Sequence, residues 1–197
     1  MTPSAPGPDA VMSRALTPLR RCSELLRAVG TGIGSPWTPA EADSWRRDAI
    51  ALIDAIAAAR RERAALGRAD DALLSAERIA IYARSMARAL VDGSAHARPM
   101  PSLSAMIAKT ASATEAYTAW MASAGTPADR RILAKAVHAA DDTLGNALAR
   151  VRQRWGNDPA SWLTFGMTLA MSQRILAEVG RPLDPAEREM PDRRDQD

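Results

Sequence analysis

The chain has 197 residues, 47% of them hydrophobic, and its 26 basic and 23 acidic residues leave a formal net charge of +3. This length is enough for one well-buried core and too short for two ample domains. The near-neutral charge balance argues against a strong electrostatic footprint for nucleic acid. The single cysteine, Cys22, excludes an internal disulfide and is typical of a reducing compartment.

Alanine is abundant, valine and the aromatic residues are scarce, and no segment alternates between apolar and polar residues with a period of two. This composition favours helices over strands. Helix starts recur in one pattern, in which an oxygen-bearing N-cap precedes a proline: Thr38-Pro39, Thr126-Pro127 and Asp158-Pro159, with a weaker copy at Asp184-Pro185. Glycines that we expect to end helices in the left-handed conformation follow at Gly30, Gly67, Gly93, Gly125, Gly156 and Gly180.

These signals predict a single-domain, all-α bundle of about six helices, mostly antiparallel because most of the loops are short. In chain order we expect the helices near residues 9–29, 39–66, 69–92, 102–124, 127–155 and 159–179. The bundle domain should span 9–180, between a flexible N-terminus at 1–8 and a polar, mobile tail at 181–197.

Charge is distributed unevenly among the expected helices. The helix at 102–124 carries only Lys109 and Glu115, and nothing between Asp158 and Arg174 is charged. Because a helix that is neutral on all sides is usually buried, we expect the helices at 102–124 and 159–179 to lie inside, the latter centrally, with arginine-bearing helices around them.

The two halves of the chain have similar punctuation. Thr38 and Thr126 are 88 residues apart, Gly67 and Gly156 are 89 apart, and Gly93 and Gly180 are 87 apart, although the side chains between them match poorly. An internal duplication of a three-helix unit explains this spacing. The alternative is that efficient helix ends resemble one another wherever they occur.

Catalytic signatures are scarce. His138, Asp141 and Asp142 could share a helix face, but no second cluster completes a metal site, and we expect His138 to pair with Asp142 on a solvated face. Cys22 lacks a neighbouring base, and the glycines at 30–34 have neither the preceding strand nor the Gly-Lys-Ser/Thr of a phosphate loop. We therefore expect a non-enzymatic protein that binds no cofactor or metal.

The remaining candidates for function are apolar side chains of the 159–179 helix and clustered arginines. We predict that an apolar groove with an arginine-rich rim binds another protein or a second copy of this chain, as an adaptor, assembly subunit, chaperone or regulator. Its residues would be Trp162, Phe165, Met167, Met171, Arg60, Arg61, Arg63, Arg150 and Arg154.

Two alternatives stay open: an arginine-rich bundle that binds nucleic acid, and a helical receptor for an apolar small ligand. The sequence shows neither a secretory signal nor a run of apolar residues long enough to cross a membrane. A cytoplasmic location is therefore expected.

Overall fold

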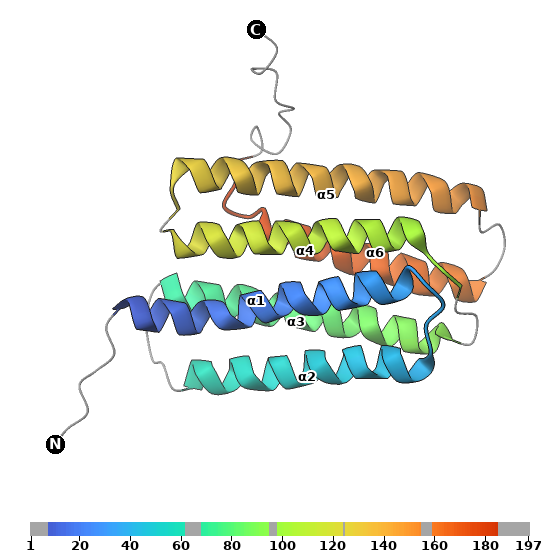
Figure 1. The fold of residues 1–197 in the computed structure, drawn as a ribbon, viewed down its shortest axis with the longest axis horizontal. Coiled ribbons are helices and arrows are strands. Elements are labelled where there is room, and N and C mark those ends of the chain that lie inside the picture. The colour runs from blue at the N-terminus through green and yellow to red at the C-terminus, as the bar shows by residue number, and fades with distance from the viewer. Residues whose placement is uncertain (1–7, 62–67, 95–97, 124, 155–158, 185–197) are drawn as a thin grey trace, which may run out of the picture.

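The computed structural model describes residues 8–61, 68–94, 98–123, 125–154 and 159–184, and these form six α-helices (Figure 1). The helices are α1 (Pro8–Ile33), α2 (Pro39–Arg61), α3 (Arg68–Asp92), α4 (Pro101–Ala122), α5 (Pro127–Arg154) and α6 (Pro159–Val179). The described ranges contain no strand, so the predicted all-α class is confirmed. Most of the predicted flexible ends, at 1–7 and 185–197, lies outside the described residues, as does the end of the expected second helix at 62–66.

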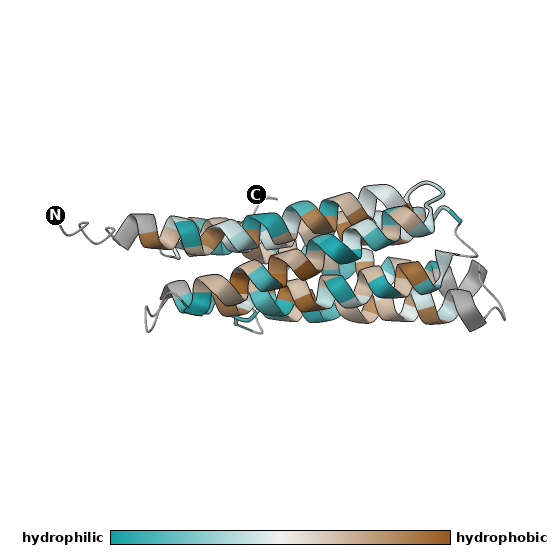
Figure 2. Cartoon of the chain, turned by 90° about the horizontal axis from the view of Figure 1, so that it is seen from below, coloured by the Kyte–Doolittle hydropathy of each residue, from teal (hydrophilic) through white to brown (hydrophobic). Residues whose placement is uncertain are grey.

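The helices form two layers. In Figure 1 the front layer consists of α5, α4, α1 and α2 in that order, and α3 and α6 lie behind it. The contacts agree with this order, because α1 packs on α4, α2 and α3, whereas α6 packs on α3, α4 and, least extensively, α5. Helices that are consecutive in the chain run antiparallel, as the short loops predict, and so do the pairs α1 with α4 and α3 with α6, whereas α1 with α3 and α4 with α6 run parallel. Figure 2 shows the two layers from below, with polar and apolar residues distributed around each helix.

The two halves of the chain are related by an approximate two-fold axis perpendicular to the layers. Rotation by 180° about an axis perpendicular to Figure 1 exchanges α1 with α4, α2 with α5, and α3 with α6. The rotation also reverses the direction of each helix, and the two members of each pair do run in opposite directions. Contacts between the halves are made mainly by the pairs α1 with α4 and α3 with α6. The topology therefore supports the hypothesis of an internal three-helix repeat.

Burial along the chain follows the same repeat. Apart from Leu16, each buried residue described in α1 has a buried counterpart 88 residues later in α4, and in α2 the same holds for all but Ala42. From Ser75 onwards, each buried residue of α3 has a buried counterpart 89 residues later in α6. Residue identities differ between the halves, so what the repeat preserves is the pattern of burial.

The first helix continues past Gly30, where the sequence predicted a stop and a loop. A Cβ at Gly30 would lie 3.3 Å from the main-chain oxygen of Ser104 on α4, and a Cβ at Gly32 would lie 2.2 Å from the Trp45 ring on α2. Both glycines therefore allow neighbouring elements to approach α1 closely. Of the predicted left-handed glycines, Gly125 has this conformation, with a φ of 79°.

The predicted helix starts are confirmed where they are described. At α2 the Glu41 amide donates to Thr38 Oγ1 at 3.2 Å, and the Thr38 amide donates to Glu41 Oε2 at 2.7 Å, which forms a reciprocal capping box. At α5 the Asp129 amide donates to Thr126 Oγ1 at 3.2 Å. These hydrogen bonds satisfy main-chain groups that the first helical turn leaves unpaired.

Of the two charge-poor helices, α4 lies inside as predicted, whereas α6 is not surrounded as expected. α1 and α4 are the inner helices of the front layer, whereas α6 belongs to the back layer and leaves one face exposed. Small residues such as Gly166 and Ala177 occupy that face, which shows that a lack of charge does not by itself require a surrounded helix. Over the described residues, no helix is long and apolar enough to cross a membrane.

Candidate functional site: the outer face of α6

The outer face of α6 brings together most of the predicted apolar site residues. The exposed residues that define this face are Leu163, Gly166, Gln173, Arg174 and Ala177, and they are flanked by the half-buried residues Trp162, Met167, Ala170 and Met171. Steps of three and four residues place the exposed set on one side of the helix. The face is free of charge from its beginning as far as Arg174.

The opposite side of α6 faces the core and explains why the helix is oriented in this way. Phe165, Ile175 and Val179 are buried there among apolar side chains. The buried threonines of this side satisfy their hydroxyls with main-chain oxygens, because Thr168 Oγ1 donates to Thr164 at 2.8 Å and Thr164 Oγ1 donates to Ala89 of α3 at 3.3 Å. Burial of this mixed face leaves Leu163 outside, with 67% of its surface exposed.

Trp162 connects the core to the outer face. Its ring meets the Phe165 ring edge-on, with centroids 6.3 Å apart and planes at 87°. This is the favourable arrangement for an aromatic pair. Phe165 itself is only 1% exposed, so it supports Trp162 from within the core and does not line the outer face.

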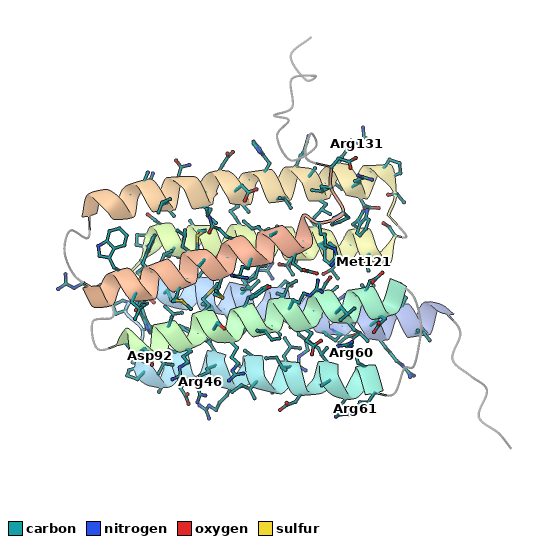
Figure 3. All side chains as sticks on the ribbon, turned by 180° about the vertical axis from the view of Figure 1, so that it is seen from behind. Arg46, Arg60, Arg61, Asp92, Met121 and Arg131 are labelled. Atoms are coloured by element: carbon teal, nitrogen blue, oxygen red, sulfur yellow. The ribbon has the colours of Figure 1, made fainter. Side chains whose placement is uncertain are left out.

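The predicted arginine rim is not assembled around this face. Arg60 and Arg61 lie at the end of the bundle where α2 ends, as Figure 3 shows, whereas α6 begins at the opposite end. Arg60 Nη1 donates to Glu77 Oε2 at 2.6 Å, and its Nε lies 3.6 Å from Asp70 Oδ1. The exposed Arg150 lies near the end of α5, on the same side of the bundle as the start of α6. Arg63 and the side chain of Arg154 lie outside what the structure describes.

Arg174 is a charged residue of this face that was missing from the predicted site. Its guanidinium carbon lies 6.0 Å from the centre of the Tyr82 ring on α3, the outer limit of a cation–π contact. Arg174 follows Leu163 by eleven residues, about three helical turns, so the two residues share a face. That spacing was visible in the sequence and could have identified Arg174.

A second group of polar residues joins α3, α4 and α6, and sequence reasoning missed it. We call Ser75, Arg78, Tyr117, Glu178 and Arg181 the Glu178 cluster. The buried Glu178 carboxylate accepts from Ser75 Oγ at 2.8 Å and from Arg78 Nη1 at 3.1 Å, and Arg181 Nη1 lies 3.7 Å away. Ser75 Oγ and Tyr117 Oη are 3.0 Å apart, and burial raises the pKa of Tyr117.

The chemistry of the Glu178 cluster is that of a structural network. Its carboxylate is already engaged by a hydroxyl and a guanidinium, and Ser75 and Tyr117 are buried. Two hydrogen-bonding partners on α3, Ser75 and Arg78, give the buried carboxylate the compensation that it needs, and Tyr117 of α4 joins the network through Ser75. The cluster therefore ties the C-terminal end of α6 to α3 and α4.

The other reactive side chains show no assembled site. His138 Nε2 lies 3.3 Å from Asp142 Oδ2, which is the helix-face pairing that the sequence predicted. Burial raises the pKa of Cys22 to about 12, and its Sγ lies 3.5 Å from the Ala76 main-chain oxygen. Among the described residues, His, Cys, Asp and Glu do not gather in any group of three or more that could hold a metal ion.

Over the part of the chain that the structure describes, the fold is an all-α bundle of six helices with an approximate internal two-fold axis. No protein-family model matches this chain, and neither a curated protein nor a solved structure is similar to it.

Proposed function

We propose that this chain is a non-enzymatic protein-binding module and that the outer face of α6 contacts the partner. The observation that carries the proposal is the exposure of Leu163, at 67%, beside the half-buried Trp162 and Met167, on the part of the face that precedes Arg174 and carries no charge. Aromatic and methionine side chains are enriched at protein interfaces, and methionine adapts to partners of different shapes. The partner would be another protein or a second copy of this chain.

The arginines give less support to nucleic-acid binding. Several of them neutralise carboxylates within the fold, as Arg27 does with Glu115, Arg60 with Glu77 and Arg78 with Glu178. Guanidinium groups that are paired in this way contribute little to the field that attracts phosphates. Protein binding through α6 therefore remains the function with the more specific support.

The test compares two substitutions of the same kind on different helices. Leu163→Glu places a charge on the outer face of α6, whereas Ile132→Glu changes an apolar residue on α5 that is also exposed, at 56%. Proteins captured by the wild-type chain after mild cross-linking in its native cell are identified, and their affinities for purified variants are measured. Loss of an anchor at the centre of an interface should weaken binding by at least about ten-fold for Leu163→Glu, with little change for Ile132→Glu.

Far-ultraviolet circular dichroism shows whether both variants keep their helices, as substitutions at exposed positions should. Equal binding by the wild-type chain and Leu163→Glu would rule out the outer face of α6 as the contact surface. Equal loss in both variants would also contradict the proposal, because it would show that the effect is not specific to α6.

A further inference from the structure

The approximate two-fold axis passes through an ion pair between equivalent residues. Arg27 of α1 donates to Glu115 of α4, and the two residues are 88 positions apart, which is the offset that relates α1 to α4. A residue that contacts its own equivalent must lie beside the axis that relates the two. The axis therefore pairs a cation in the first half with an anion in the second.

The seam between α3 and α6 contains two equivalent contacts that differ in charge. At one, Thr164 Oγ1 donates to the Ala89 main-chain oxygen at 3.3 Å. At the other, Ser75 Oγ donates to Glu178 Oε1 at 2.8 Å. Ser75 is the counterpart of Thr164, and Glu178 is the counterpart of Ala89, each at an offset of 89 residues. Only the second contact introduces a carboxylate, which Arg78 neutralises at 3.1 Å.

The counterpart of Arg78 in α6 is Met167, which carries no charge. If the second halves of two chains paired with each other, each Glu178 would meet Thr164 and Met167 of the other chain and would lose Arg78. Glu115 would then face Glu115, and in the matching pair of first halves Arg27 would face Arg27. Pairing of unlike halves therefore places an opposite charge beside each of these groups. Pairing of like halves leaves Glu178 without its cation and brings equal charges together at positions 27 and 115.

We propose that Arg27, Arg78, Glu115 and Glu178 form a charge code that selects pairing between the unlike halves and disfavours association of like halves from two copies of the chain. The repeat makes such a code necessary, because both halves bury the same positions and present similar apolar surfaces to each other. Glu178 carries most of the selectivity because it is buried, whereas Arg27 and Glu115 are half-exposed and screened by solvent.

Because positions 27 and 115 lie beside the two-fold axis, a cross-link at position 27 can detect the pairing of like halves. A thiol at position 27 lies beside position 115 when unlike halves pair, either within one chain or between exchanged halves. Two copies of position 27 meet only when like first halves pair. All variants therefore carry Arg27→Cys as the reporter and Cys22→Ala to remove the native thiol. They are unfolded, refolded at high concentration and treated with a short thiol-to-thiol cross-linker.

The reporter chain should remain monomeric on a denaturing gel. Adding Glu115→Gln and Glu178→Met removes the charges that disfavour like halves, and should increase the cross-linked dimer by at least about ten-fold. The matched control keeps Glu115→Gln and carries Thr164→Ala in place of Glu178→Met. It alters the equivalent contact but retains the buried carboxylate, and because Glu115 is half-exposed the dimer fraction should stay close to that of the reporter alone.

Equal dimer fractions in the reporter, the control and the charge-free variant would overturn the proposal. So would a reporter chain that is already extensively cross-linked. If circular dichroism shows that Glu178→Met does not fold, Glu178→Gln takes its place, because it keeps the size of the side chain and a hydrogen bond to Ser75. A folded Glu178→Gln variant without additional dimer would count equally against the code.

Discussion

Gly93→Ala should destabilise the protein, although alanine is usually the more stabilising residue where the backbone allows it. The φ of Gly93 is outside the left-handed region, so the backbone itself accepts alanine. The obstacle is the neighbouring helix, because an added Cβ would lie 2.2 Å from Thr164 Oγ1 and 3.0 Å from Thr164 Cβ. Thr164 is buried and β-branched, and rotating it would break its hydrogen bond to the Ala89 main-chain oxygen.

Overpacking a buried contact costs about 1–3 kcal/mol. Restricting the unfolded chain by replacing glycine offsets about 0.4–1 kcal/mol of this loss. The expected net loss of unfolding free energy is therefore about 1–2 kcal/mol. Urea titration followed by far-ultraviolet circular dichroism measures it. Gly145→Ala is the matched control, since nothing lies within 4 Å of its added Cβ, and it should stabilise α5 by about 0.5–1 kcal/mol.

A double-mutant cycle separates the contact from other effects. Thr164→Ala removes the atoms that obstruct the new methyl group, so Gly93→Ala should be less destabilising in that background than in the wild-type chain. If Gly93→Ala is as stable as the wild-type protein or more stable, the close approach of α3 and α6 at this point is refuted.

Two further predictions concern titrating groups. Burial raises the pKa of Cys22 from 9.0 to about 12, so its contribution to stability is complete below pH 9 and falls as the pH rises towards 12. Between pH 7 and 10 the wild-type chain should lose on the order of 1 kcal/mol more than Cys22→Ala in urea titrations. An equal loss in both chains would contradict the burial of the thiol. Hydrogen bonds from Thr38 lower the pKa of Glu41, so this carboxylate stabilises the fold above its unfolded pKa and loses that effect as the pH falls through its folded pKa. Thermal melts of Glu41→Gln should therefore depend less on pH in the acid range than those of the wild-type chain, whereas an unchanged dependence would argue against the capping box.

Local sequence signals predicted most of the helices correctly. The helix starts at Pro39, Pro127 and Pro159 were marked by a cap and a proline, which act through neighbouring main-chain groups. Gly30 was misread because a glycine that ends a helix and a glycine that accommodates a neighbouring helix are the same residue. Only the position of Ser104 against Gly30 distinguishes the two roles.

The candidate site was predicted in part. Trp162, Met167 and Met171 flank the outer face of α6, but Phe165 is in the core and Leu163 is the most exposed large apolar residue described. All of them lie within three turns of the uncharged part of one helix, and the sequence offered no signal for which side would face α3. The packing of α6 on α3 and α4 made that choice.

Local signals in the chain were enough to predict the helices, most of their ends and the near-repeat between the two halves, because propensity, capping and hydrophobic periodicity act over a few residues. Which helix faces meet became clear only from the packing of the bundle. That packing brings Ser75 to Glu178 across 103 residues of chain and Arg27 to Glu115 on the two-fold axis. The physical reason is that burial and charge pairing depend on distances in space, which a one-dimensional pattern does not contain.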